Sequence, residues 1–211
     1  MHKVIIILGS GSQGLITSDL CRDMDLKVKG FLDDTKDVGT QVNGLPVMGE
    51  FSLARDGSLG KDVSYTVALG DPFARSQIFR KILLAGGEAA TIVHPKAWIS
   101  PSATIGEGSV ISPFCYLKAG ARIGRFCLLE VGCSIGVENE VGEGVFLGPS
   151  CQLNAHVRIG EKSFLGTGAV VIPQRKIGAG CIIGAGATVT EYIPPNKVAV
   201  GSPARIIKNR T

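Results

Sequence analysis

The sequence is poor in the residues that most often mark active sites, membrane segments and nucleic-acid surfaces. Its 211 residues include three histidines and one tryptophan, and aromatic residues make up 6% of the chain. No run of eighteen apolar residues is present, and the apolar stretch Val4–Leu8 is too short for a membrane span or a signal peptide. The net charge of +4 comes from scattered lysines and arginines, which argues against nucleic-acid binding. We therefore expect a cytoplasmic protein that contacts neither a membrane nor nucleic acid.

An aliphatic residue recurs at every sixth position over a long C-terminal stretch. The positions are Ile99, Ile105, Ile111, Leu117, Ile123, Leu129, Ile135, Val141, Leu147, Leu153, Ile159, Leu165, Val171, Ile177, Ile183 and Val189. This hexapeptide period predicts short strands joined by corners, with three strands in each coil of a parallel β-helix.

The position after each aliphatic residue is rich in glycine. Its glycines are Gly106, Gly124, Gly136, Gly142, Gly148, Gly160, Gly166, Gly178 and Gly184. Because the chain must turn sharply at each corner, we expect this column to adopt positive φ.

Five of the six cysteines share one position of the period. Cys115, Cys133 and Cys151 are eighteen residues apart, and Cys127 and Cys181 occupy the same column. Several alanines share this column, so we expect a small interior position. The column has neither C-x-x-C spacing nor a histidine, which favours free thiols packed as small hydrophobes over a disulfide or metal array. Free thiols also indicate a reducing compartment.

The first 94 residues follow a different pattern. Strands are expected at Val4–Leu8, Lys27–Leu32, Tyr65–Leu69 and Ala90–Val93, and helices at Leu15–Met24 and Arg75–Leu84. This order begins as a βαβ unit and predicts a small Rossmann-like α/β domain.

A G-x-G-x-x-G motif lies between the first expected strand and helix. Gly9, Gly11 and Gly14 form the motif, and Asp33 and Asp34 follow about twenty residues later, where a dinucleotide fold binds a ribose. The domain has half the length of a classical dinucleotide fold, which suits a mononucleotide better than NAD. The alternative is a glycine-rich turn that only packs the strand against the helix.

Short motifs along the whole chain carry a family resemblance. ILGSGSQG, GFLDD, GLPVMG, VALGD and TIVHPKAWISPSATIGEG precede the hexapeptides, and VAVGSPARIIK follows them. In this order they resemble the sialic acid O-acetyltransferase and UDP-4-amino-sugar N-acetyltransferase family. The resemblance implies a sugar-nucleotide-binding domain over 1–94, a left-handed β-helix over 95–211, a homotrimer and acetyl-coenzyme A (acetyl-CoA) as donor.

The resemblance also implies an acceptor site in the first domain. Its residues would be Gly9, Ser10, Gly11, Ser12, Gln13, Gly14, Asp33 and Asp34. Backbone N–H groups at a helix N-terminus suit a pyrophosphate, and a carboxylate suits ribose or base donors. The family usually has histidine where this chain has Gln13, and glutamine cannot titrate near neutral pH.

The usual general base of the family is absent. Relatives carry histidine followed by an acidic residue at the positions of Val137 and Glu138, and an asparagine where this chain has Glu130. His156 lies eighteen residues after Glu138, so the two should be about 4.8 Å apart on adjacent coils. We therefore predict His156 as the base, with Glu138 orienting it.

Two alternatives to this pair stay open. Glu130 is the competing base, although it could equally be an exposed corner charge. In the third mechanism the amine attacks directly and the leaving thiolate takes the proton, so that positioning supplies the acceleration. His94 at the domain junction and the terminal His2 are expected to be poor bases.

The resemblance places coenzyme A (CoA) on the C-terminal coils. The segments are FLGPSC, which begins at Phe146, FLGTGAV and IIGAGATV. They place Gly148, Gly166 and Gly184 at one corner, where small residues would admit a pantetheine arm. Beyond them, Arg205 and Lys208 are expected to bind the nucleotide phosphates of CoA. Side chains alternate between inward and outward along each strand, and this alternation predicts that Phe146 and Phe164 face outward, toward a neighbouring subunit.

The sequence thus predicts an acetyl-CoA-dependent N-acetyltransferase, with no bound metal, that acts on a nucleotide-linked amino sugar in surface glycan precursor synthesis. The alternatives are O-acetylation of a sugar or sialic acid, and a non-catalytic trimer that binds sugar nucleotides.

Overall fold

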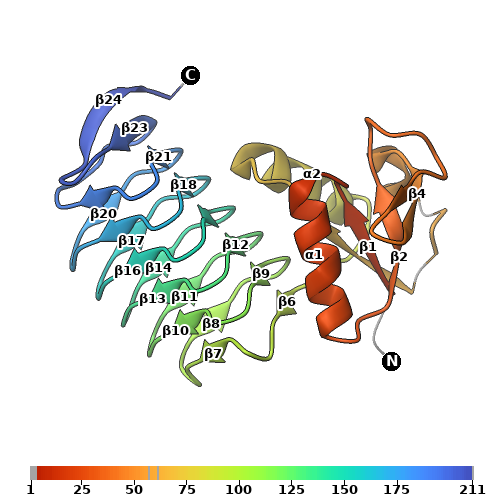
Figure 1. Cartoon of the computed structure of the whole chain (residues 1–211), viewed down its shortest axis with the longest axis horizontal. Coiled ribbons are helices and arrows are strands. Elements are labelled where there is room, and N and C mark those ends of the chain that lie inside the picture. The colour runs from red at the N-terminus through yellow and green to blue at the C-terminus, as the bar shows by residue number, and fades with distance from the viewer. Residues whose placement is uncertain (1–3, 57, 61, 211) are drawn as a thin grey trace. The chain divides into compact units, whose positions relative to one another are not determined.

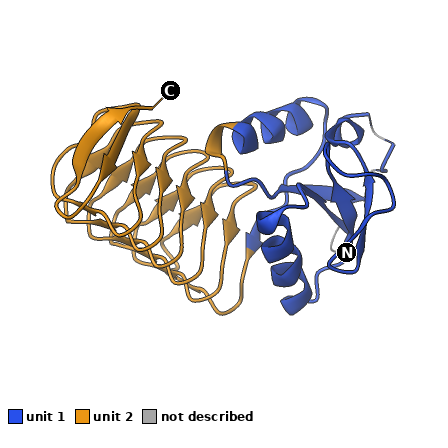
Figure 2. Ribbon diagram, turned by 45° about the horizontal axis from the view of Figure 1, so that its top comes forward, with its two compact units in different colours: residues 1–70, 74–92 blue, residues 71–73, 93–211 orange. Residues whose placement is uncertain are grey.

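The computed structural model describes residues 4–56, 58–60 and 62–210. The chain divides into two compact units, drawn in blue and orange in Figure 2. Unit 1 comprises residues 1–70 and 74–92, and unit 2 comprises residues 71–73 and 93–211. Of the helices within the described ranges, none is long and apolar enough to cross a membrane.

Unit 1 is a small α/β layer built on one sheet with the strand order β3-β4-β2-β1-β5 (Figure 1). Its elements are β1 (Val4–Leu8), α1 (Ser12–Asp23), β2 (Val28–Leu32), β3 (Gln41–Val42), β4 (Leu45–Gly49), the 3₁₀ turn η1 (Phe51–Ala54), β5 (Val63–Val67) and α2 (Pro72–Leu84). β1 pairs in parallel with β2 and β5, β2 pairs in parallel with β4, and β3 is antiparallel to β4. β1 is an apolar interior strand between β2 and β5, and its residues after Val4 are buried.

Several boundaries in unit 1 differ from those expected. α1 begins at Ser12 rather than Leu15, because its first turn is polar and leaves no trace in the apolar period. β5 ends at Val67, which pairs with Leu8, the last residue of β1. The strand expected at Ala90–Val93 is replaced by an isolated bridge at Ala89 and by β6 (Ile92–Val93).

Unit 2 is a left-handed parallel β-helix whose strands form three sheets. The strands are β7 (Trp98–Ile99), β8 (Thr104–Ile105), β9 (Val110–Ile111), β10 (Tyr116–Leu117), β11 (Arg122–Ile123), β12 (Leu128–Leu129), β13 (Ser134–Ile135), β14 (Glu140–Val141), β15 (Phe146–Leu147), β16 (Gln152–Leu153), β17 (Arg158–Ile159), β18 (Phe164–Leu165), β19 (Val170–Val171), β20 (Lys176–Ile177), β21 (Ile182–Ile183), β22 (Thr188–Val189), β23 (Lys197–Val200) and β24 (Arg205–Asn209). Each residue of the predicted aliphatic column is the second residue of one strand from β7 to β22, which confirms the hexapeptide period.

The three sheets follow one another around each coil. The six-stranded sheet runs from β7 to β22, the five-stranded sheet from β8 to β20, and the eight-stranded sheet from β6 to β24. From β7 to β22, strands pair in parallel with the equivalent strand eighteen residues away. β21 pairs in parallel with β23 at a shorter offset, Ile182 with Val198, and β24 is antiparallel to β23. A side chain therefore lies directly above its equivalent in the preceding coil.

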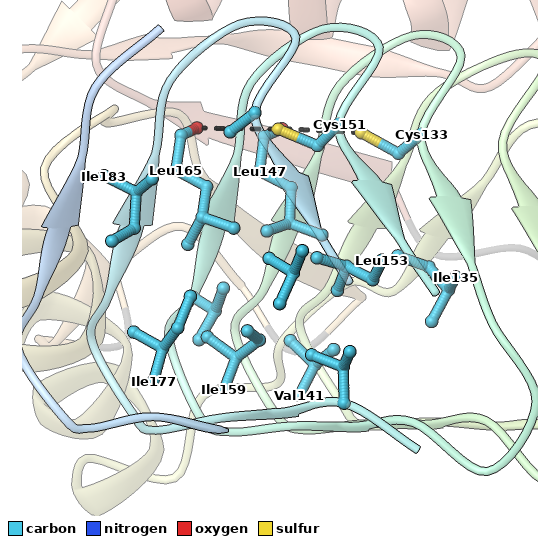
Figure 3. Packing of buried hydrophobic residues seen from close by; sticks show 14 of the residues in the cluster. Cys133, Ile135, Val141, Leu147, Cys151, Leu153, Ile159, Leu165, Ile177 and Ile183 are labelled. Carbon is cyan, nitrogen blue, oxygen red and sulfur yellow. Dashed lines mark hydrogen bonds between the residues drawn. The ribbon is translucent and has the colours of Figure 1, made fainter. Parts of the chain in front are cut away.

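The aliphatic column and the cysteine column fill the interior of the β-helix (Figure 3). The five cysteines of this column are free and buried, as expected, and so is Cys21 in unit 1. The Sγ atoms of Cys133 and Cys151 lie 3.2 Å from the carbonyl oxygens of Gly148 and Gly166, fifteen residues ahead in each case. The thiols therefore link adjacent coils as weak donors while they pack as small apolar groups.

The glycine column does not have the positive φ that was expected. Positive φ occurs instead at every sixth residue from Gly108 to Gly186, a column that includes Glu138 and His156. At Gly142 an added Cβ would lie 2.6 Å from the backbone nitrogen of Glu161 in the next coil. The glycines of the predicted column are therefore needed because the coils stack closely, and the turn itself is made two residues later.

Candidate active site

The glycine-rich turn of unit 1 lies at the N-terminus of α1. Gly9 has φ of 96°, and a Cβ on Gly14 would collide with the carbonyl oxygen of Gly9. Gly11 is the N-cap residue, and α1 has no side-chain cap. The first-turn N–H groups of α1 therefore have no side-chain acceptor and suit an anion such as a phosphate.

Asp33 accepts four hydrogen bonds, two from the glycine-rich turn and two from the loop after β2. Its Oδ2 accepts from the backbone N–H of Ser10 at 2.8 Å and from the Ser10 hydroxyl at 2.6 Å. Its Oδ1 accepts from the backbone and hydroxyl of Thr35 at 2.9 and 2.6 Å. Burial opposes ionisation of Asp33, but these hydrogen bonds outweigh it and lower the pKa of the carboxyl to about 2.

Asp33 and Asp34 therefore have different surroundings, although the sequence predicts the same role for both. Asp33 and Ser10 are buried and engaged with each other. Asp34 is exposed, and its Oδ1 accepts the backbone N–H of Phe51 at 2.7 Å. Asp34 can reach a ligand, whereas Asp33 positions the turn.

Lys36 is a further candidate, which the glycine-rich motif does not predict. Its Nζ lies 2.9 Å from the carbonyl oxygen of Ser10, so a cation stands beside the glycine-rich turn. The sequence gives no signal for this contact, because Lys36 lies outside the motif and is brought back by the loop after β2.

In unit 2, one corner follows the six-stranded sheet and precedes the five-stranded sheet; we call it the histidine corner. It contains Glu138, His156 and Gln174, which are eighteen residues apart and share a positive φ. Glu138 Oε2 lies 3.4 Å from His156 Nδ1, and the two side chains are 62% and 51% exposed. The structure thus brings together the two residues that the period predicted to meet.

Val137 lies beside this pair, at the position where relatives are expected to carry the base. Its carbonyl oxygen accepts the backbone N–H of His156 at 2.9 Å, and the residue is 38% exposed. An exposed valine here cannot transfer a proton. Of the other two histidines, His94 is buried with its Nδ1 accepting the Lys96 N–H at 3.1 Å, and His2 lies outside the described residues.

A second corner follows the eight-stranded sheet and precedes the six-stranded sheet; we call it the glycine corner. It contains Glu130, Gly148, Gly166 and Gly184, at intervals of eighteen residues. Glu130 is 6% exposed, so the interpretation of it as an exposed corner charge is wrong. The histidine and glycine corners are different edges of one triangular coil, and Glu130 and His156 therefore lie apart within one chain.

Gly148 and Gly166 are also required by the stacking of the coils, whether or not a ligand binds there. A Cβ on Gly148 would lie 2.8 Å from the nitrogen of Thr167, and one on Gly166 would lie 2.6 Å from the nitrogen of Ala185. The backbone of the next coil thus occupies the space that a side chain would fill. These glycines therefore give no specific evidence for a pantetheine arm.

The phenylalanines of the eight-stranded sheet are more covered than expected. The rings of Phe146 and Phe164 stack with centroids 4.7 Å apart, but Phe146 is only 9% exposed in the single chain. Phe146 therefore does not need a neighbouring subunit to cover it, although the alternation of side chains along the strand suggested that it would. Trp98 and Tyr116, on the outer face of the six-stranded sheet, stack at 4.5 Å and are more exposed.

Arg205 and Lys208 lie on β24, whose side chains are all exposed. Arg205 Nη1 is 3.9 Å from Glu191 Oε1, a distance at which an exposed pair contributes little. Both cations are accessible to an anionic ligand.

The fold is that of a hexapeptide-repeat protein, and comparisons with known proteins identify the class as acyltransferases. Residues 4–82 match the model of the PglD N-terminal domain, and residues 156–191 match that of the bacterial transferase hexapeptide. Over 113 residues the chain is 36% identical to UDP-N-acetylbacillosamine N-acetyltransferase of Bacillus subtilis. That match covers 52% of this chain and spans about half of the curated relative, 51% of its length.

Solved structures resemble the whole chain. A perosamine N-acetyltransferase from Caulobacter crescentus, a variant with one histidine replaced by asparagine, was solved with CoA and GDP-perosamine. It is 30% identical, has a TM-score of 0.92 and aligns over 98% of this chain and 97% of its own. The acetyltransferase domain of PglB from Neisseria gonorrhoeae, solved with acetyl coenzyme A, is 29% identical and has a TM-score of 0.90. The alignment covers 98% of this chain and 100% of that domain. The chain belongs to the sialic acid O-acetyltransferase and UDP-4-amino-sugar N-acetyltransferase family of hexapeptide-repeat acyltransferases.

Proposed function

We propose that this protein transfers the acetyl group of acetyl-CoA to the amino group of a nucleotide-linked amino sugar, in the synthesis of a surface glycan precursor. The observation that carries the proposal is the similarity along 98% of the chain to an enzyme that was solved with CoA and GDP-perosamine. No metal is required for this reaction.

His156 takes the proton of the attacking amine in this proposal. Glu138 faces Nδ1 of the imidazole, so Nε2 is the atom directed to the acceptor. The amine nitrogen bonds to the thioester carbonyl carbon, Nε2 takes the ammonium proton, and the carbon–sulfur bond breaks to release the CoA thiolate. The exposure of His156 supports this role over Glu130, which is buried within the chain.

The acceptor and donor would occupy different parts of the chain. The first turn of α1, with Lys36 beside it, suits the acceptor pyrophosphate, and Asp34 suits a ribose hydroxyl. Gly148, Gly166 and Gly184 of the glycine corner, together with Phe146 on β15 and Arg205 and Lys208 on β24, remain the proposed CoA surface.

We also propose a cytoplasmic homotrimer. A site that used both the histidine corner and the glycine corner would need two copies of the chain, because the corners lie on different edges of one coil. The exposed stack of Trp98 and Tyr116 is an apolar surface that a second copy would cover. Light scattering at micromolar concentration should show three chains, and a persistent monomer would rule out a two-chain site.

The decisive assay uses the purified chain, acetyl-CoA and 4-amino sugars linked to UDP, GDP or dTDP. Mass spectrometry should show addition of one acetyl group to one of these acceptors. Treatment of the product with hydroxylamine removes an ester and leaves an amide, so it separates O-acetylation from N-acetylation. A product that loses its acetyl group would establish the O-acetyltransferase alternative.

A non-catalytic role is the second candidate, and Val137 is the observation that favours it. Nucleotide-sugar binding without acetyl transfer to any of the acceptors would support it. In that case the Glu138–His156 contact would be a surface ion pair of little energetic consequence.

A further inference from the structure

A cleft of about 440 Å³ opens within unit 1, where β2, β4 and β5 end. Asp34 lies after β2, Glu50 after β4 and Leu69 after β5, and the opposite wall is formed by α2. Apart from Asp34, the proposed function uses none of its lining residues. Ligands of open α/β sheets bind at this edge, beyond the carboxyl ends of the strands.

The glycine-rich turn borders the cleft at Leu69. A Cβ on Gly9 would lie 2.9 Å from Leu69 Cδ2, so the turn contacts a wall of the cleft. Asp33 binds Ser10 of the turn, and its neighbour Asp34 lines the cleft. A nucleotide with its phosphates at the turn and its ribose at Asp34 would therefore place its base in the cleft.

The lining combines apolar walls with polar groups of both charges. Phe51, Leu69 and Ile78 suit the faces of a flat ring. Glu50 brings a carboxylate that only accepts hydrogen bonds, whereas Arg55 and Lys81 bring donors. Within the described chain, the side chains of these three charged residues form no hydrogen bond or ion pair.

We propose that this cleft selects a guanine base, which makes the acceptor a GDP-linked sugar; the inference rests on the proposed function. Guanine presents O6 and N7 as acceptors for Arg55 or Lys81. On its other edge, N1–H and the N2 amino group are adjacent donors that one carboxylate, Glu50, accepts together. Uracil and thymine offer a single ring N–H and leave Glu50 with one donor. Adenine has no carbonyl for the cations.

Isothermal titration of the full chain with GDP, IDP and UDP, without sugar or CoA, tests this assignment. GDP should bind more than about tenfold tighter than UDP, because charge-assisted hydrogen bonds are the stronger ones. IDP, which lacks the N2 amino group, should bind with intermediate affinity. Glu50→Gln should weaken the binding of GDP by about tenfold to hundredfold and remove the preference for GDP over IDP. The affinity for UDP should stay unchanged.

Asp37→Asn, an exposed carboxylate outside the cleft, is the matched control and should leave GDP binding unchanged. An unaltered melting temperature shows that Glu50→Gln is folded. UDP binding as tight as GDP binding, or GDP binding that survives Glu50→Gln, would overturn the guanine assignment. Failure to bind any nucleotide would overturn it as well. Acetylation of a UDP-linked amino sugar would refute this inference and leave the proposed function intact.

Discussion

The two units hold their candidate functional residues in different ways. In unit 1 the glycine-rich turn and the loop after β2 are joined by the hydrogen bonds of Asp33, so the site depends on a few polar contacts. In unit 2 each corner residue is fixed by the backbone of the coils on either side, as His156 is by Val137. We therefore expect unit 1 to be sensitive to pH and polar substitutions, and unit 2 to any atom added between coils.

The largest effect is expected at the histidine corner, because it alone is predicted to perform proton transfer. His156→Asn should lower turnover by about 10²–10⁴-fold with little change in KM. Steady-state kinetics measure this, with Glu140→Gln as the control for loss of a nearby exposed carboxylate.

The same kinetics on Glu130→Gln separate the alternatives. Near-native turnover of His156→Asn together with inactivity of Glu130→Gln would identify Glu130 as the base. Activity in both variants would favour direct attack without a protein base.

The second-largest effect is expected from substitutions between stacked coils. Gly142→Ala would place a Cβ 2.6 Å from the nitrogen of Glu161, and should lower the free energy of unfolding of the β-helix by about 1–3 kcal/mol. Urea unfolding measures the loss. Gly70→Ala, where a Cβ meets nothing within 4 Å, should be nearly neutral, and an equal loss in both variants would contradict the stacking argument.

Asp33 tests the polar contacts of unit 1. Its folded-state pKa of about 2 lies below the unfolded value of about 3.9, so its contribution is full above the unfolded pKa and is lost as pH falls through 2. Wild type should lose about 2 kcal/mol over this window, and Asp33→Asn should lose that stability already at neutral pH. Urea unfolding at several pH values measures both, and a pH dependence unchanged in Asp33→Asn would be inconsistent with the hydrogen-bond network.

The smallest effect is a gain. Gln174 has φ of 62° at the histidine corner, where glycine is favoured, so Gln174→Gly should stabilise the protein by about 0.5–1 kcal/mol. Gln152→Gly, in strand β16, should destabilise it by about 0.5–1 kcal/mol. Thermal unfolding compares the two, and the same sign for both would argue against conformational strain at the corner.

The period predicted most of unit 2, because a repeat of six fixes both the strand and the face of every residue. It placed Ile135 and Leu147 in the core and brought Glu138 to His156. It could not show that positive φ falls two residues after the glycines, since their role is close approach. Nor could it show that Glu130 is buried, because the period predicts which way a side chain points but not what covers it.

In unit 1 the sequence predicted the strands and glycines but not the contacts. The separation of Asp33 from Asp34 depends on which side each residue faces at the end of β2, and the cleft depends on β4, η1 and α2 together. β3 and β4 were missed altogether, because two- and five-residue segments around a turn give little periodic signal. The division of the chain at residue 94 remains a prediction.

The stacking of equivalent coils also has a dynamic consequence. A coil in the middle of the β-helix contacts neighbours on both sides, whereas the coils at either end can separate from one neighbour alone. Local opening should therefore advance inward from the ends like fraying, and amide hydrogen exchange should be slowest near the centre. The coils that carry Glu138 and His156 lie in that slow region, so the proposed proton-transfer pair stands on the part of the repeat that opens least often.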